Sequence, residues 1–299
     1  MNILITGGSG LIGRALCNKL KQEHKLIVLT RHPQRAKARL GQDIQLVESL
    51  NQWQDLNQFD AVINLAGEPI ADKRWSQAQK DRICQSRWQI TQTLTDLIKA
   101  SSEPPSVFIS GSAIGIYGRQ DAQPIDETFT DYHDEFSHQV CQRWEDIANQ
   151  VKEITRVCTL RTGIVLSHEG GALKKMLPPF KMGLGGKMAS GYQYMSWIHL
   201  DDMVAAIRWL LSQDNLHGPF NLTAPHPVTN REFTRYLAMA LHRPVLFPMP
   251  ETVLKVIFGE MSEILIYGQN VIPSKLRESG FEFHYSELEP ALADIVDKL

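Results

Sequence analysis

The sequence lacks three features that would each point to a definite class of protein. Its four cysteines show neither the spacing of a metal site nor a paired disulfide framework, so we expect free thiols and no bound metal. No apolar run reaches the roughly 18 residues that a membrane span needs. The formal net charge of −2 argues against nucleic acid or an anionic membrane as a partner. We therefore expect a cytoplasmic protein that acts on a small molecule.

The segment at residues 2–13, NILITGGSGLIG, joins an apolar run to regularly spaced glycines. The run predicts a buried strand, and the apolar spacing that begins at Leu11 predicts a helix. Gly7 permits a tight turn, Gly10 lets the backbone approach a pyrophosphate, and Gly13 lets the helix pack close to the strand. The amides at the start of the helix would point at the phosphates. This pattern predicts a dinucleotide site.

The end of the second predicted strand, at residues 25–30, indicates which dinucleotide is bound. An NAD-preferring site would carry Asp or Glu here for the ribose 2′-hydroxyl. This chain instead has Thr30 and Arg31, with Arg35 close behind. Because a guanidinium is well suited to gripping a phosphate, the site favours NADP(H). A solvated surface role for Arg31 is the alternative.

Strands and helices alternate along the rest of the first half. Strands are predicted at residues 60–65, 106–113 and 155–161, and helices at residues 76–100 and 136–150. This alternation predicts an α/β fold with a doubly wound parallel sheet, a Rossmann domain. We expect that domain to span residues 1–165, with residues 197–222 returning to it.

The pattern changes after residue 165. Residues 170–191 are rich in Gly and Lys and poor in periodicity, as expected for a substrate-side loop or lid. A capping box at Thr229 and Glu232 predicts that a helix follows. We expect residues 166–196 and 223–299 to form a substrate-side loop and a smaller, mainly helical cap.

Several motifs occur in the order seen in extended short-chain dehydrogenases/reductases, the NAD-dependent epimerase/dehydratase superfamily, which the whole chain resembles. They are TGGSGLIG at 6–13, NLAG at 64–67, SGS at 110–112, YG at 117–118 and WIHLDD at 197–202. More narrowly, NLAGEPIA at 64–71, SRW at 86–88 and GLGG at 183–186 resemble the atypical bacterial "epimerase family protein" group. Members of that group carry a C-terminal domain of unknown function. The resemblance implies the fold and NADP(H) binding.

The motifs and the strand ends together give a set of predicted cofactor contacts. The small-residue turn at Ala66 and Gly67 would let the cofactor lie against the backbone. Glu68 could approach the ribose or the substrate, with an exposed loop charge as the alternative. The predicted cofactor-binding residues are Gly7, Ser9, Gly10, Leu11, Ile12, Gly13, Thr30, Arg31, Arg35, Leu65, Ala66, Gly67, Glu68 and Ser110.

The chain departs from the superfamily where the chemistry would take place. The resemblance implies a Ser or Thr after the fifth strand, which Ser112 matches, and a Tyr-x-x-x-Lys pair on the next helix. Alignment through Glu145 places Ser137 and Cys141 where the Tyr and the Lys would stand. A Tyr pKa near ~10 must fall by about three units to act at neutral pH, roughly 4 kcal/mol of electrostatic help. An unassisted Ser alcohol is much further from that range.

Two replacements for the missing proton donor can be named. Tyr117 follows the Ser112 turn and would lie at the mouth of the pocket, with a substrate-shaping aromatic as the alternative. His138 and Cys141 are three residues apart and share a helix face, so they could form a reactive pair. A surface His beside a buried Cys is the alternative for that pair.

Three further residues are predicted to meet the substrate. Arg87 lies near a position where related enzymes often place an Asn, and it could bind an anionic substrate unless it forms an ordinary helix ion pair. His199 could face the pocket, with the acid pair that follows it capping the next helix. Lys187 could bind a phosphate or carboxylate, although solubility alone would explain it.

Two classes of function are compatible with these residues. The first is an NADP-dependent oxidoreductase or epimerase acting on a small polar, sugar-like carbonyl or hydroxyl compound, with Ser112 hydrogen-bonded to the reacting oxygen. The second is an NADP(H)-binding sensor or regulatory scaffold without turnover. A homodimer is usual in the superfamily.

Overall fold

A seven-stranded parallel sheet forms the centre of the computed structural model, which describes residues 1–299. Across the sheet the strands are β11 (Gly218–Leu222), β7 (Arg156–Thr162), β5 (Val107–Ala113), β4 (Ala61–Asn64), β1 (Asn2–Thr6), β2 (Lys25–Leu29) and β3 (Gln45–Val47). The strand order reverses at β1, which pairs with β2 on one side and with β4 on the other. In open α/β sheets, ligands bind beyond the carboxyl ends of the strands at such a reversal.

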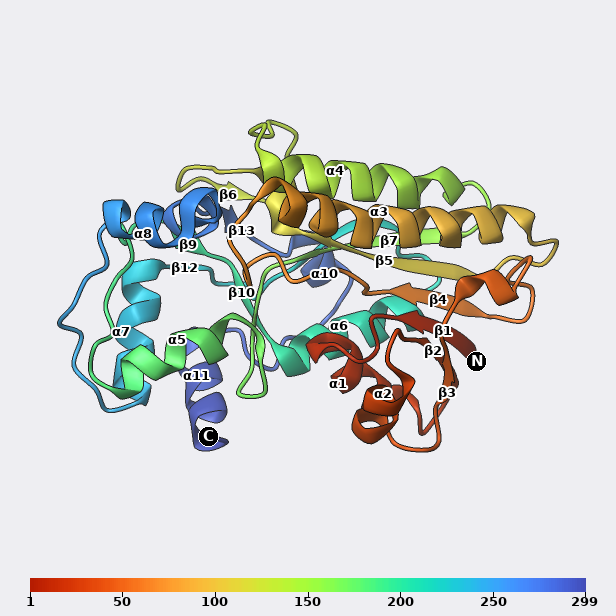
Figure 1. Ribbon diagram of the computed structural model, residues 1–299, viewed down its shortest axis with the longest axis horizontal. Helices are drawn as coiled ribbons and strands as arrows, with labels where there is room; N and C mark the ends of the chain where they lie inside the picture. Colours follow the sequence, from red (N-terminus) through yellow and green to blue (C-terminus); the bar gives the residue numbers. More distant parts are fainter.

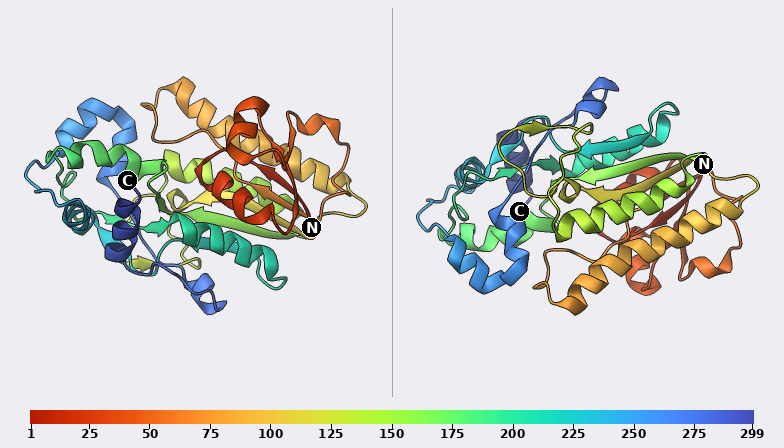
Figure 2. Two further views of the ribbon diagram at one scale, coloured as in Figure 1. Left: turned by 90° about the horizontal axis from the view of Figure 1, so that it is seen from below. Right: turned by 90° about the horizontal axis from the view of Figure 1, so that it is seen from above.

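Helices cover both faces of this sheet, α3 and α4 on one and α1, α2 and α6 on the other (Figure 1). Views from below and from above show one helical layer in front of the sheet in each case (Figure 2). The bounds are α1 (Leu11–Leu20), α2 (Pro33–Leu40), α3 (Gln77–Ala100), α4 (Phe136–Ala148) and α6 (Leu200–Ser212). The predicted doubly wound α/β fold is therefore confirmed.

The apolar runs of the strands are buried on both faces because helices lie on each side. In β1, Ile3 and Ile5 belong to the core beneath α1 and α6, while Leu4 belongs to the core beneath α3. This alternation is the two-residue period of a strand. All three side chains are fully buried.

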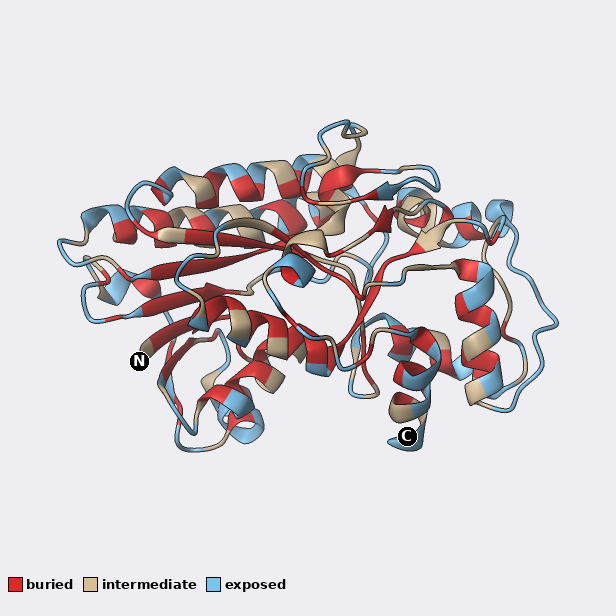
Figure 3. Cartoon of the chain, turned by 180° about the vertical axis from the view of Figure 1, so that it is seen from behind, coloured by how far each residue is buried: buried red, intermediate tan, exposed pale blue.

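The second half of the chain adds a mainly helical region at the carboxyl end of the sheet, with a core of its own. Leu177, Phe233 and Leu292 represent that core, and burial colouring shows it as inward-facing red stripes on the helices (Figure 3). Its helices are α5 (Gly171–Lys181), α7 (Asn230–Ala240), α8 (Glu251–Phe258), α9 (Glu263–Ile266) and α11 (Leu288–Asp297). The short helix α10 (Ser274–Glu278) instead packs against β11, and its Leu276 belongs to the core of the sheet. Short strands join the parts: β6 (Pro124–Ile125), β8 (Ile164–Leu166), β9 (Tyr194–Met195), β10 (Trp197–His199), β12 (Val228–Thr229) and β13 (Asn270–Val271).

The expected irregular loop at residues 170–191 is wrong in its first half, which is the helix α5. Leu173, Leu177 and Phe180 are all buried at helical spacing, but Pro178 and Pro179 interrupt the sequence signal. By contrast, the predicted capping box at Thr229 and Glu232 forms and starts α7. None of the helices combines the length and the apolar character that a bilayer crossing requires. The domain boundaries given above remain a prediction.

Candidate functional site at the carboxyl edge of the sheet

The turn after β1 is packed so closely that two of its glycines leave no room for a side chain. Gly7 has a φ of +70°, and a Cβ there would lie 2.4 Å from the carbonyl oxygen of Leu65. A Cβ on Gly13 would lie 2.3 Å from the carbonyl oxygen of Gly7. Gly10 is the N-cap of α1 and has no side-chain cap, so the first amides of the helix are not covered by a side chain. This backbone cradle fits the pyrophosphate of a dinucleotide.

The basic residues predicted to select NADP lie at the neighbouring strand end. Arg31 follows β2 and Arg35 lies in the first turn of α2, and both side chains are exposed. Neither is among the residues that form ion pairs within the chain. Thr30 is instead buried, and its hydroxyl accepts a hydrogen bond from the His32 amide. Two uncommitted guanidinium groups therefore stand where a 2′-phosphate is expected.

Ser110 differs from the other predicted cofactor residues because it is fully buried. It lies in a polar cluster under the edge, in which the Asn64 amide donates to the hydroxyls of Thr91, at 2.8 Å, and Ser110, at 3.5 Å. The Thr6 hydroxyl in turn donates to Asn64 at 2.6 Å. This burial removes the Ser110 hydroxyl from the predicted cofactor contacts.

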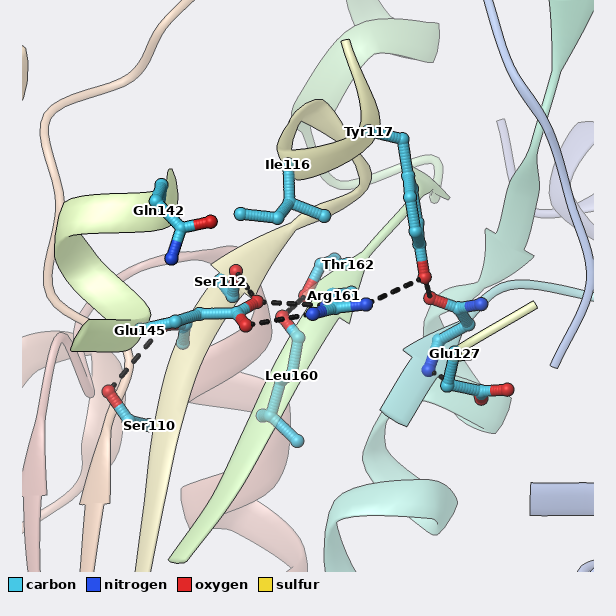
Figure 4. A network of polar contacts seen from close by, with 12 residues as sticks. Ser110, Ser112, Ile116, Tyr117, Glu127, Gln142, Glu145, Leu160, Arg161 and Thr162 are labelled. Carbon is cyan, nitrogen blue, oxygen red and sulfur yellow. Dashed lines mark hydrogen bonds and ion pairs between the residues drawn. The ribbon is translucent and has the colours of Figure 1, made fainter. Parts of the chain in front are cut away.

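Ser112 is held by a buried ion pair that the sequence analysis missed (Figure 4). Its hydroxyl donates to Glu145 Oε1 at 2.7 Å. Arg161 donates to both Glu145 oxygens, from Nε and Nη2, each at 3.0 Å. Burial opposes the charge on Arg161, but the hydrogen bonds and charge of Glu145 outweigh it, so the Arg161 pKa lies above its ordinary value. Ser112 therefore keeps its oxygen lone pairs free while its proton is committed to Glu145.

The expectation that Tyr117 lies at the mouth of the pocket is wrong. Its side chain is fully buried, and its hydroxyl donates to Asn221 Oδ1 at 2.7 Å while accepting from Arg161 Nη1 at 3.0 Å. Burial raises the pKa of the Tyr117 phenol far above its usual range despite the nearby Arg161. The residue extends the Ser112 network toward β11 and has no open face for a substrate.

The predicted pairing of His138 with Cys141 is not formed. His138 Nδ1 lies against the Ile116 carbonyl oxygen, so this ring nitrogen is bonded to the backbone of the preceding turn. Burial raises the pKa of the Cys141 thiol to about 12, which leaves it protonated at neutral pH. Ser137, at the position of the superfamily Tyr, donates to Glu135 Oε1 at 2.6 Å.

Arg87 lies at the carboxyl edge, between α3 and α4, with no acidic partner. A Cβ on Gly67 would lie 3.0 Å from the Arg87 guanidinium carbon, and the Trp144 ring centroid is 5.2 Å from the same atom. Nη1 donates to the Ile83 carbonyl at 3.0 Å, while Nε and Nη2 have no hydrogen-bond partner. Burial lowers the Arg87 pKa. The expected alternative of a helix ion pair is therefore wrong.

His199 and Lys187 are committed elsewhere. His199 is 3 % exposed; its Nδ1 accepts from the Asp201 amide at 3.1 Å and caps α6, and its Nε2 lies 3.3 Å from Asp294. The acid pair does not cap this helix, because Asp202 binds the amides of residues 284 and 285. The expectation that His199 faces the pocket is thus wrong. Lys187 donates to the Ser190 carbonyl within its own loop.

A cavity of about 590 Å³ lies away from this edge, at the carboxyl ends of α1 and α6. Its lining includes His24, Trp209 and Phe281, none of which contacts the Ser112 network. The candidate site therefore consists of the glycine cradle and the part of the carboxyl edge of the sheet that carries Ser112 and Arg87. Arg161, a charged residue inside an apolar strand, is the signal that could have revealed the missed ion pair.

Comparisons with known proteins agree with this geometry. The family model "NAD dependent epimerase/dehydratase family" matches residues 3–223. The chain belongs to this family. A second model, a domain of unknown function, matches residues 249–295, as the sequence resemblance implied. The first match, together with the similarity to the human protein described next, identifies the chain as an atypical short-chain dehydrogenase/reductase with an NAD(P)-binding fold.

Proteins similar to this chain occur in bacteria and in humans. An epimerase family protein of Staphylococcus aureus (strain MRSA252) is 37% identical over 297 residues, which cover 99% of each chain. The human epimerase family protein SDR39U1, crystallised with NADPH, is 31% identical with a TM-score of 0.89 and full coverage of both chains. A nucleoside-diphosphate sugar epimerase from Corynebacterium glutamicum is 27% identical with a TM-score of 0.77. The match spans 99% of this chain and 58% of that protein.

Proposed function

We propose that this protein is an NADP(H)-dependent oxidoreductase or epimerase that acts on a small polar, sugar-like compound. The observation that carries the proposal is the Ser112 hydroxyl, held at the carboxyl end of β5 by Glu145 at 2.7 Å. It stands beside a glycine cradle that fits a dinucleotide. The buried free thiols support the predicted cytoplasmic location.

The residues of the cradle would hold the dinucleotide through the backbone. Gly7, Gly10 and Gly13 leave space for the pyrophosphate, and the start of α1 directs amides toward it. Arg31 and Arg35 would bind the 2′-phosphate, since neither cation is paired within the chain. The bound nicotinamide supplies or accepts a hydride. The NADPH in the human relative supports NADP(H) over NAD(H).

Ser112 would contact the reacting oxygen of the substrate. Because its proton is given to Glu145, its oxygen can accept a hydrogen bond, and it therefore fits a substrate hydroxyl better than a carbonyl. Arg161 fixes Glu145 with two hydrogen bonds, so the Ser112 hydroxyl keeps one orientation.

Arg87 would bind an oxyanion at the same edge. Its Nε and Nη2 form an open edge of two parallel donors, which matches a carboxylate or phosphate. The flat contact with Gly67 and Trp144 holds the guanidinium in place before a ligand arrives. This favours a substrate with an anionic group.

An NADP(H)-binding sensor without turnover is the second candidate. It is favoured by the protonated Cys141 thiol and by the buried, fully bonded Tyr117 hydroxyl, because neither can replace the missing Tyr–Lys pair directly. Such a protein would keep the cradle and the basic pair but carry out no reaction.

The two candidates are separated by adding a cell metabolite extract to the protein with NADP⁺ and following the appearance of NADPH fluorescence. An oxidoreductase should form NADPH, and an epimerase should change the ratio of two epimers without net NADPH; Ser112→Ala should slow either change by at least about tenfold while the variant still binds NADPH. Ser106→Ala, an exposed serine just before the amino end of β5, is the matched control. Binding with neither NADPH formation nor a change in the epimer ratio of any metabolite would support the sensor.

A further inference from the structure

One end of the molecule carries an exposed surface that is both apolar and basic. It is formed by residues 181–187, by the loop 241–250 between α7 and α8, and by α8 itself, at the end of the long axis farthest from the N-terminal strands (Figure 1). Leu246 and Phe247 are 63% and 55% exposed, and Val256 is 75% exposed. The other exposed apolar side chains of this surface are Met182, Leu184, Val245, Met249, Val253 and Ile257.

The segments of this surface are joined by backbone contacts, so the apolar groups form one region. Arg243 Nε donates to the Lys181 carbonyl at 2.9 Å, and the Met249 amide donates to the Lys187 carbonyl at 2.8 Å. A Cβ on Gly186 would lie 1.9 Å from the Phe247 carbonyl oxygen, which shows how closely the two loops run. A soluble monomer rarely leaves such a continuous apolar region uncovered unless it binds something.

The charge of this region differs from that of the whole chain. Residues 181–187 and 241–258 contain four Lys or Arg residues and one Glu, although the chain has a formal net charge of −2. The basic residues are Lys181, Lys187, Arg243 and Lys255. Within the region, Lys255 pairs with Glu251. Lys181 and Arg243 are exposed and form no ion pair, so the surface presents free positive charge beside Leu246 and Phe247.

We propose that this surface docks onto an anionic lipid bilayer. Exposed aliphatic and Phe side chains flanked by Lys and Arg match the interface between headgroups and acyl chains. The helix α8 adds the same pattern, with Leu254 buried and Val253, Val256 and Ile257 turned outward beside Lys255. A second copy fits the surface less well, because a two-fold contact would bring two positive surfaces together.

The proposal is tested by sedimenting the full chain with vesicles of phosphatidylcholine alone and with vesicles that contain about one third phosphatidylglycerol. The expected result is at least about tenfold tighter binding to the anionic vesicles, with most of the gain lost in high salt. The double variant Leu246→Ser/Phe247→Ser should weaken this binding about tenfold or more. Lys181→Glu/Arg243→Glu should abolish the preference for anionic vesicles.

Ile154→Ser serves as the matched control, because this exposed apolar residue lies before β7, outside the region. Its binding should equal that of the wild type, and Val256→Ser alone gives a milder test of the same surface. No binding to anionic vesicles at low salt, or equal binding by the double variant, would overturn the proposal. A wild-type dimer that Leu246→Ser/Phe247→Ser converts to a monomer in light scattering would also overturn it, because a second copy would then cover the surface.

Discussion

Ser112 and Arg161 lie directly opposite each other in the β5–β7 pairing, and Glu145 of α4 joins them. The hydroxyl at the expected reaction site thus depends on a carboxylate and a guanidinium that are 7% and 6% exposed. A buried pair of this kind is costly to break, because the partner left behind keeps an uncompensated charge. The site is therefore sensitive to substitution of either charged residue.

Replacing Glu145 should therefore destabilise the fold strongly. Glu145→Ala leaves the buried Arg161 guanidinium without its acid, and we expect a loss of about 3–5 kcal/mol in the free energy of unfolding. Urea denaturation measures the change. Glu153→Ala, whose side chain is 87% exposed, should change stability by less than about 0.5 kcal/mol and is the control. Equal effects of the two variants would contradict the structural role of the pair.

The glycine cradle makes a second prediction. In Gly13→Ala the new methyl would meet the Gly7 carbonyl oxygen at 2.3 Å, so the turn must shift. We expect most of the NADPH affinity to be lost, together with about 2–3 kcal/mol of stability. Isothermal titration and urea denaturation measure the two effects. Gly170→Ala, whose methyl would have an ordinary 3.5 Å contact with Leu11, should keep both properties.

The choice between NADPH and NADH should depend on Arg31. Arg31→Ala removes a charged donor from the expected 2′-phosphate and should weaken NADPH by about 1–3 kcal/mol, with NADH nearly unchanged. Fluorescence titration with both cofactors gives the comparison, and Lys37→Ala, an exposed cation on the following helix α2, is the control. If both cofactors weakened equally, the phosphate assignment would be wrong.

Glu127 should make stability depend on pH in a defined direction. Burial raises the pKa of this carboxyl above its ordinary value, although the amides of Asn221 and Lys275 donate to it. A carboxyl whose pKa is raised by folding stabilises the fold below its ordinary pKa, and this stabilisation is lost as the pH rises through the folded-state value.

The free energy of unfolding of the wild type, minus that of Glu127→Gln, should therefore fall between about pH 4 and pH 8. Urea denaturation of both proteins across this range gives the difference. A constant or rising difference would show that the Glu127 pKa is not raised. A difference in the free energy of unfolding that is the same at every pH does not affect this test, because only the change with pH is compared.

Local signals explain which parts of the fold could be predicted. The strand–turn–helix at residues 2–20 depends on adjacent residues, so its glycines and apolar spacing predict it fully. The helix α5 was hidden because its two prolines interrupt the pattern that Leu173, Leu177 and Phe180 follow.

The contacts of the site depend on register and packing between distant segments. Glu145 and Ser112 are 33 residues apart, and only the packing of α4 on β5 brings them together. Tyr117 was expected at the mouth of the pocket because the sequence does not reveal how deeply its turn is buried. The formal net charge of the chain does not reveal the basic region around Arg243, because acidic residues elsewhere in the chain balance its charge.

Hydride transfer between NADP(H) and a metabolite can be followed by isotope transfer. The protein is incubated with a cell metabolite extract and NADPH deuterated at C4, each face in turn, and the metabolites are searched by mass spectrometry. We expect that one metabolite gains a single deuterium from one face of the cofactor with the wild type, and far less with Ser112→Ala. Binding of NADPH in the same sample with no incorporation from either face would contradict it.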